Sequence, residues 1–267
     1  TYSLTLTTCS FNNLNFTGFS GTYAAGTGTS IVYGNLTYGT ATSTSGTTGG
    51  LTLSGTTGIQ IITTNGRTIA HALTINNTGT SVQLADNITS SNTIAFTTGT
   101  LDINSKTTTG FTTATFATGP STIQNGTLNT TTGITHTSGT LNLSATGPGN
   151  IASAGTYTFT AGALNLLGNQ TVTVATFSSA NDNTKSIAFG TGNITTTGSG
   201  SVWSAATVTG LTYTGTPTVN ISNNSASATT VSTHNTGGTA SNVFNFNFTI
   251  GDRKSTRLNS SHGYISY

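Results

Sequence analysis

Carboxylates are the side chains of this sequence that could do acid–base chemistry, and they are few. The 267-residue chain has no glutamate, and charged residues make up 4% of it. Before residue 252 the acidic residues are Asp86, Asp102 and Asp182, which stand far apart in the sequence. Hydrolysis of a glycosidic bond needs two carboxyl groups about 5–10 Å apart. We therefore expect no enzyme, with a polysaccharide-degrading β-helix enzyme as an alternative that a close pair of these aspartates would support.

The histidine and cysteine positions do not indicate a metal site or a reactive thiol. His71, His136 and His234 are widely separated, and no two histidines form a His-x-His pair. Cys9 is the single cysteine, so an internal disulfide is impossible, and we expect it to be a small buried apolar residue. The sequence predicts no metal site, no cofactor and no catalytic residue.

Aromatic residues are the best candidates for binding. Tyr23, Tyr33 and Tyr38 cluster near the start of the chain, and Trp203 is the only tryptophan. Exposed rings could stack on sugars while nearby hydroxyls and amides bind the sugar hydroxyl groups. The alternative is that these rings fill a core and keep their polar tips at its edge. We take the four residues as candidate ligand-binding residues, with cell-surface glycans as the candidate partner.

Thr-x-Thr pairs raise the possibility of ice binding. Such pairs occur at Thr5 and Thr7, at Thr27 and Thr29, and at Thr171 and Thr173. An ice-binding face needs one pair per repeat on one flat side, and the irregular spacing of these pairs argues against it. An ice-binding β-solenoid is therefore kept as an alternative function.

The last 16 residues differ from the rest of the chain. Charges are sparse up to Gly251 and then arrive together in the run DRKSTRLNSSH, which begins at Asp252. This run resembles the translation of a common short-read sequencing adapter, and the resemblance extends to Tyr267. We expect 252–267 to be a disordered tail of foreign origin and 1–251 to be a fragment of the natural protein.

Without this tail the sequence carries no net charge. Three basic residues, Arg67, Lys106 and Lys185, balance the three aspartates before residue 252. Nucleic-acid binding depends on clustered lysine and arginine at phosphates. We therefore expect no nucleic-acid partner, and we expect no insertion into a membrane.

Alternating apolar residues predict short β-strands. Val172 and Val174 flank Thr173, and Phe244, Phe246, Phe248 and Ile250 alternate with polar residues. This period of two is typical of a half-buried strand, whereas threonine, asparagine and glycine are poor helix formers. The fold class predicted is all-β.

Imperfect repeats favour a stacked architecture. Small residues followed by Leu-x-Leu or a close variant recur at Leu51, Leu101, Leu141 and Leu164, with no fixed period. Two or three short strands would make a coil of roughly 20–30 residues, and stacked coils share one core. We predict a right-handed parallel β-helix (β-solenoid) over 1–251, with a β-sandwich as the alternative.

Part of the sequence resembles a known class of proteins. Three stretches carry the likeness: TTGTLDINSKT (97–107), ATFSSANDNTKSIAFGTGNITTTGSGSVW (175–203) and GLTYTGTPTVNIS (210–222). They resemble Thr/Gly/Asn-rich β-solenoid proteins of environmental phage tail-fibre, virion-surface or bacterial adhesin type.

The resemblance implies a structural or adhesive rod outside the cell. The first expectation is a phage tail-fibre or virion-surface protein that presents a weak, multivalent carbohydrate-binding surface. A bacterial cell-surface adhesin or autotransporter-like passenger is the alternative. The resemblance also implies a homo-oligomer, such as a trimer, located extracellularly on a virion or a cell surface.

Overall fold

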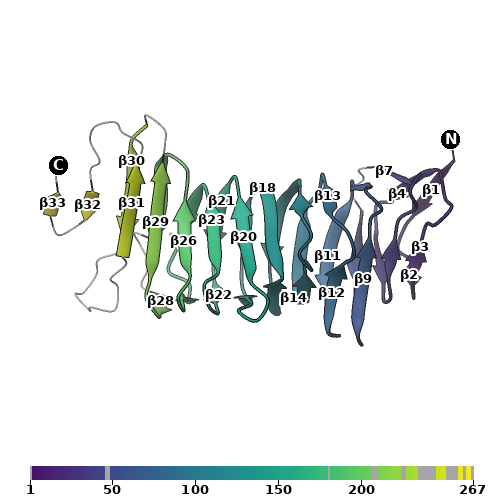
Figure 1. Cartoon of the computed structure of the whole chain (residues 1–267), viewed down its shortest axis with the longest axis horizontal. Coiled ribbons are helices and arrows are strands. Elements are labelled where there is room, and N and C mark those ends of the chain that lie inside the picture. The colour runs from purple at the N-terminus through teal and green to yellow at the C-terminus, as the bar shows by residue number, and fades with distance from the viewer. Residues whose placement is uncertain are drawn as a thin grey trace.

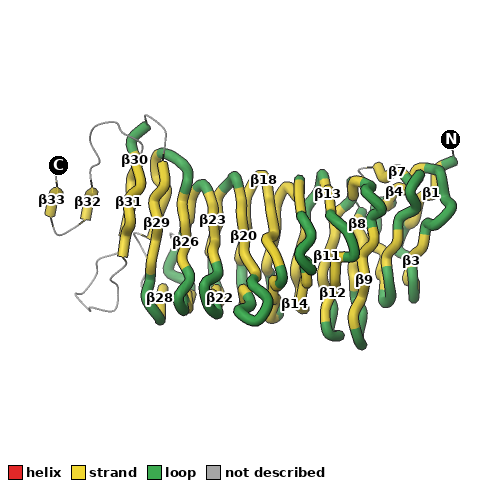
Figure 2. The backbone as a smooth tube through the Cα atoms, viewed as in Figure 1, coloured by secondary structure: helices red, strands yellow, loops and turns green. Residues whose placement is uncertain are grey.

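The protein is a long stack of parallel β-strands. The computed structural model describes residues 2–45, 49–179, 181–205, 210–223, 227–233, 245–250, 258–260 and 263–265. Within these residues every regular element is a strand, and the strands stack into a β-solenoid of about ten turns (Figures 1 and 2). Parallel pairing between successive coils excludes the β-sandwich and confirms the predicted β-solenoid.

Each coil contributes strands to three outer faces. Face one is built from β1 (Ser3–Leu6), β4 (Thr22–Ala25), β7 (Ser43–Ser45), β10 (Thr68–Ile69), β13 (Ile88–Ser90), β15 (Thr108–Thr109), the first half of β18 (Gly126–His136), β20 (Gly149–Ser153), β23 (Thr171–Val174), β26 (Asn193–Thr196), β29 (Thr218–Asn223) and β31 (Asn245–Ile250).

Face two follows face one along the chain. It is built from β2 (Ser10–Phe11), β5 (Thr29–Val32), β8 (Gly50–Leu53), β11 (Ala72–Asn76), the first part of β14 (Ile94–Asp102), β16 (Phe111–Phe116), the second half of β18, β21 (Thr156–Phe159), β24 (Thr176–Ser178), β27 (Gly200–Ala205) and β30 (Thr229–Thr233).

Face three closes each coil. It is built from β3 (Leu14–Asn15), β6 (Leu36–Thr37), β9 (Ile59–Thr63), β12 (Ser81–Leu84), the last part of β14, β17 (Pro120–Gln124), β19 (Thr140–Leu143), β22 (Gly162–Leu166), β25 (Lys185–Ala188) and β28 (Leu211–Thr214).

Unequal coils explain why the sequence repeat has no fixed period. On face two, Tyr157 pairs with Phe177, whereas Trp203 pairs with Val231 across a longer coil. Leu141 pairs directly with Leu164 on face three, but Leu51 lies on face two. The recurring Leu-x-Leu motif therefore marks the same inward strand geometry on two faces, and its spacing mixes steps between coils with steps between faces.

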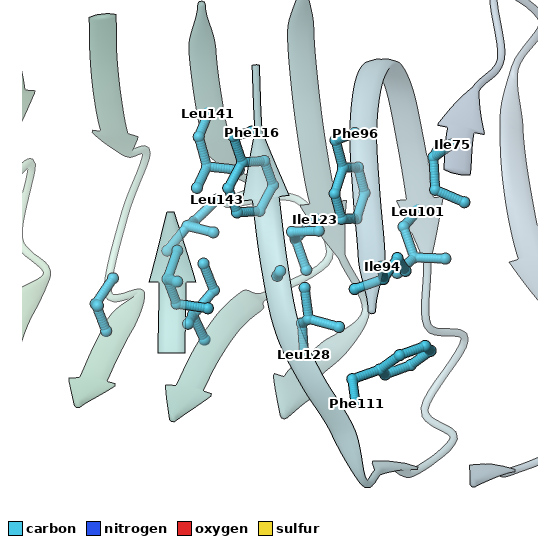
Figure 3. Packing of buried hydrophobic residues seen from close by; sticks show 14 of the residues in the cluster. Ile75, Ile94, Phe96, Leu101, Phe111, Phe116, Ile123, Leu128, Leu141 and Leu143 are labelled. Carbon is cyan, nitrogen blue, oxygen red and sulfur yellow. The ribbon is translucent and has the colours of Figure 1, made fainter. Parts of the chain in front are cut away.

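Alternation along each strand sends apolar side chains into one continuous core. Figure 3 shows Phe96, Phe116, Ile123 and Leu128 pointing into the space that the three faces enclose. Neighbouring rings stack along the axis: the Phe96 and Phe116 ring centroids are 4.8 Å apart. A coil cannot bury its apolar side alone, so stacking supplies the hydrophobic driving force of this fold.

Asparagine turns the chain from face three to face one. Asn65, Asn104 and Asn125 have φ values of 51°, 53° and 56° at this corner of successive or nearby coils. Asparagine tolerates this left-handed conformation better than other residues with a Cβ atom, because its amide bonds locally. The side-chain amide of Asn104 (Nδ2) donates to the Leu84 carbonyl of the preceding coil at 3.0 Å. The corner thus fixes both the turn and the alignment between coils.

Two short strands lie in the C-terminal stretch where the sequence predicts a disordered tail. Strands β32 (Leu258–Ser260) and β33 (Gly263–Ile265) pair antiparallel, unlike the coils. The foreign origin of 252–267 stays a prediction. In the part of the chain that the structure describes, there is no helix of the length and apolar character that a membrane crossing requires.

Candidate functional site

Asp86 and Asp102 are held by hydrogen bonds that support the backbone. Asp86 accepts bonds from the Thr64 amide at 2.9 Å, from the Thr64 hydroxyl at 3.0 Å and from the Asn65 amide at 2.5 Å. It therefore secures the corner turn of the preceding coil. With its oxygens occupied in this way, Asp86 serves as a structural acceptor.

Asp102 is likewise saturated by donors. It accepts bonds from Gln83 Nε2 at 2.9 Å, from the main-chain amide of Asn104 at 2.9 Å and from Asn125 Nδ2 at 2.8 Å. Burial raises the pKa of the Asp102 carboxyl, but the hydrogen bonds, led by those from Asn125 and Gln83, bring it below its usual value. An ionised carboxylate enclosed by amides is a poor general acid at neutral pH.

Asp102 lies in a different outward column from the asparagines that follow the first leucine of the later Leu-x-Leu motifs. Asn142 pairs with Asn165 in one outward column of face three, whereas Asp102 pairs with Gln83 and Gln124 in another. The shared Leu-x-Leu motif therefore does not place these polar residues in the same column. The hydrogen-bond set of Asp102, rather than its position in the motif, explains its role.

All charge before residue 252 lies on one side of the rod. Asp102 and Lys185 are on face-three strands β14 and β25, and Asp182 is in the loop that leads into β25. Lys185 Nζ is buried and donates to the main-chain and side-chain oxygens of Asn181, each at 2.6 Å. The remaining charges, Arg67, Asp86 and Lys106, occupy turns that leave face three. The described strands of faces one and two consequently carry no charged side chain.

The two described histidines are buried and paired with tyrosines. His71 Nε2 lies 2.5 Å from Tyr38 Oη, and its Nδ1 lies 3.2 Å from the Ala72 carbonyl oxygen. His136 Nδ1 lies 2.9 Å from Tyr157 Oη. Burial lowers the pKa of both histidines to about 4. Each ring is therefore neutral at pH 7 and accepts a hydrogen bond from its tyrosine, which makes it part of the core.

The described residues contain no cluster of histidine, cysteine or acidic side chains that could hold a metal ion. His234 lies outside the described residues. Cys9 is half-buried beside face two, and its amide donates to Ser30 Oγ at 3.2 Å. The described part of the chain thus assembles no thiol or metal chemistry around these residues.

Three of the four candidate aromatic residues are in the core. Tyr23 and Tyr38 are fully buried and pack with Phe16, whose ring stacks on that of Tyr38 at 5.6 Å. Trp203 is also fully buried, and its ring centroid is 4.5 Å from that of Phe177. The prediction that these three rings are available to sugars is therefore corrected, because their faces are covered by other rings.

Tyr33 alone among the four candidates reaches the surface. It is 47% exposed and directly follows strand β5 on face two. The structure does not bring it together with the other three aromatics at a surface site. A ring at one end of a long face gives at most one stacking contact, so the repeated features of the faces must supply any extended binding.

Outward side chains on face one bond to one another. Thr195 Oγ1 and Asn220 Nδ2 both donate to Asn193 Oδ1, at 3.1 Å and 3.2 Å. On the next coil, Asn247 Nδ2 donates to Asn220 Oδ1 at 3.0 Å. Similar asparagine bonds join β20 to β23, where Thr171 donates to Asn150. Face one therefore uses much of its hydrogen-bonding capacity to tie successive coils together.

Face two presents a longer and more uniform set of hydroxyls. One outward column contains a hydroxyl residue from each coil between β8 and β30 except at Ala95: Thr52, Thr74, Thr115, Thr135, Thr158, Ser178, Ser204 and Ser232. Ile31 on β5 pairs with Thr52 and ends this run of hydroxyls. We call these eight residues the hydroxyl column. Within the described part of the chain, none of the eight side chains makes a hydrogen bond to protein.

A partial second column runs beside the first. Thr113, Thr156 and Thr176 lie two residues before members of the hydroxyl column, and Gly133 fills the intervening coil. These three hydroxyls also have no hydrogen-bond partner in the described part of the chain. Alternation predicted that such residues face outward. It did not predict their alignment, because the coils between them differ in length.

The Thr-x-Thr pairs noted in the sequence do not build this array. Thr171 and Thr173 lie on β23 of face one, and Thr5 lies on β1 of the same face. Thr29 begins β5 on face two, and Thr27 precedes that strand.

No family model matches this chain, and no match is found among curated proteins or solved structures. The candidate site is therefore defined by its own geometry, as the uncharged outer sides of faces one and two.

Proposed function

We propose that this protein is an extracellular structural and adhesive rod, of phage tail-fibre or virion-surface type. The observation that carries the proposal is the confinement of charge to one side of a long solenoid. Two whole faces thereby present uncharged hydroxyls and amides at regular steps along the axis. Neutral glycans, which are recognised through their own hydroxyl groups, are the ligands that such faces suit.

Adhesion by this rod rests on many weak contacts. A single hydrogen bond contributes about 0.5–1.5 kcal/mol net, because water competes for both partners. Repetition over successive coils raises the overall affinity without any new kind of contact, provided that one ligand chain or one cell surface spans several coils. Tyr33 supplies the exposed ring among the four candidate aromatics.

A rod held by parallel stacking also suits presentation at a distance from a surface. Most strands pair with a strand of the next coil along the stack (Figure 1), and one core of buried apolar residues runs along the axis. These features support a stiff, protease-resistant spacer equally on a virion and on a bacterial cell, so the adhesin or autotransporter-like passenger remains the second form of the proposal. Assembly into a homo-oligomer such as a trimer is part of both forms.

Glycan-array binding of the full chain tests this proposal. We expect binding to extended neutral glycans that weakens sharply when the immobilised ligand density is lowered, as multivalency requires. Light scattering on the same sample measures whether the chain assembles. A monomeric chain that retains no glycan at any density would overturn the adhesive role.

A further inference from the structure

The hydroxyl column of face two differs from the asparagine columns of faces one and three, because its side chains have no hydrogen-bond partner in the described protein. Its eight hydroxyls are outward, half-buried or exposed, and none bonds to another part of the described chain. A hydroxyl offers one donor and two acceptor sites. The column thus holds an unused set of donors and acceptors at fixed positions on a rigid support.

The positions of these hydroxyls follow from the backbone. Paired strands are about 4.8 Å apart, so neighbouring hydroxyls in the column repeat at about that step. The second column, represented by Thr113, Thr156 and Thr176, is displaced by two residues, or about 6.6 Å, along the strands. Strands of successive coils stack side by side along the rod in Figure 1, so the columns follow its long axis.

The chemistry of the face limits what can bind it. The described face-two strands carry no charge and, on their outward side, no aromatic ring. Sites for single small molecules are usually concave, with a few converging polar groups, and an open row of hydroxyls lacks that form. A ligand that matches the row must itself be uncharged, extended, and periodic in hydrogen-bonding groups. The surface of an ice crystal has these properties.

We propose that face two is an ice-binding face centred on Thr115, Thr135 and Thr158. The hydroxyls hold water molecules in rows that continue into the crystal, and the threonine methyl groups lose their contact with liquid water when the face docks. Contacts repeat from coil to coil, so the chain stays on the crystal although each contact is weak. The bound rod then prevents growth of the ice beneath it.

Face one and face three are poorer candidates for the same ligand. On face one, the side chains of Asn193, Thr195 and Asn220 already bond to one another, so their positions serve contacts between coils. On face three, Asn165 bonds to Asn142 and Gln83 bonds to Asp102, so these outward side chains also serve contacts between coils. These differences allow controls on the same molecule.

Thermal hysteresis, the gap between the melting and freezing temperatures of ice, tests the proposal on the full chain. We expect measurable hysteresis and retention of the protein in a slowly grown ice hemisphere. Thr158→Lys places a long cation in the centre of the hydroxyl column at an exposed position, and we expect it to reduce hysteresis several-fold. Thr122→Lys, an outward threonine in β17 of face three, is the matched control and should leave hysteresis unchanged.

Circular dichroism and melting temperature show whether each variant is folded. If Thr158→Lys unfolds the chain, Thr135→Val, which keeps shape and removes the hydroxyl, serves as the second variant, and a reduction of hysteresis is again expected. Absence of hysteresis in the unmodified chain overturns the proposal, as does an equal loss in Thr158→Lys and Thr122→Lys. Retention on microcrystalline cellulose or chitin without incorporation into ice would assign the face to a polysaccharide surface and overturn ice binding.

Discussion

The inner and outer columns of face two are built by the same strands but follow different rules. Inward residues change greatly in size from coil to coil: Ala114, Ile134, Tyr157, Phe177 and Trp203 form one column. The outward residues beside them are hydroxyl-bearing and small throughout: Thr115, Thr135, Thr158, Ser178 and Ser204. A stable interior requires only that apolar groups fill its volume at close packing, and residues of different size can do this in different coils.

The uniformity of the outer column is therefore not explained by folding. Many polar residues would satisfy an outward strand position, and face three uses asparagine, glutamine and aspartate there. A hydroxyl without a protein partner adds little to stability. The comparison teaches that the inner column accounts for the fold, whereas the outer column points to a contact outside the chain.

Acidification should affect the inner column and give the largest effect. The folded pKa of about 4 for His71 and His136 lies below the unfolded value of about 6.5, so unfolding takes up protons between these values. The free energy of unfolding should keep its full value above pH 6.5. It should fall as the pH drops towards 4, by about 3 kcal/mol for each histidine. Urea midpoints measured at pH 7.5, 5.5 and 4 check this.

A double variant separates the contribution of one histidine. His136→Phe together with Tyr157→Phe replaces both partners of a buried hydrogen bond by apolar rings, which costs little when both are removed. We expect about half of the pH dependence to disappear in this variant. A stability that does not change with pH in the unmodified chain would contradict the burial of neutral histidines.

Truncation of the inner column should give the next largest effect. Trp203→Ala removes a fully buried ring that stacks on Phe177, and we expect a loss of about 3–5 kcal/mol from the free energy of unfolding. Ser204→Ala, at the neighbouring outward position, is the matched control and should change stability by less than about 0.5 kcal/mol. Equal effects of the two variants in denaturant unfolding would contradict the assignment of inside and outside.

The inside of the solenoid could be predicted from the sequence only where apolar and polar residues alternate clearly. Val172 and Val174 were correctly expected on one side of their strand. Alternation is weak at Trp203, because Val202 and Trp203 are both buried where the register with β30 shifts. Tyr23 is flanked by small residues on both sides, so its strand gives little contrast between inside and outside.

The outer column could not be predicted because it depends on the register between coils. Thr135 and Thr158 are neighbours in space only because β18 pairs with β21, and the loops between strands set that alignment. Longer coils separate Phe177 from Trp203 and Trp203 from Val231. No fixed period connects these positions, so counting along the sequence gave scattered Thr-x-Thr pairs and missed the column.

The asparagine corner should show a smaller effect than the core. Asn125→Ala puts a residue with poor tolerance of a φ of 56° at the corner and removes the bond to Asp102, which together should cost about 1–3 kcal/mol. Asn125→Gly keeps the backbone conformation and loses only the bond, so its loss should be smaller. If thermal unfolding ranks the two variants in the opposite order, the backbone conformation is not what asparagine provides there.

Removal of one outer hydroxyl should give the smallest change in stability and the most informative one. Thr135→Val keeps the shape of a side chain whose hydroxyl has no protein partner, so the free energy of unfolding should stay within about 0.5 kcal/mol. Asn165→Ala, on face three, removes a 2.8 Å bond to Asn142 and should cost about 0.5–1.5 kcal/mol. Thermal hysteresis should respond in the opposite way, with a loss in Thr135→Val and no change in Asn165→Ala. A stability loss in Thr135→Val as large as that in Asn165→Ala would mean that folding does use the outer column, and the argument for an external ligand would lose its basis.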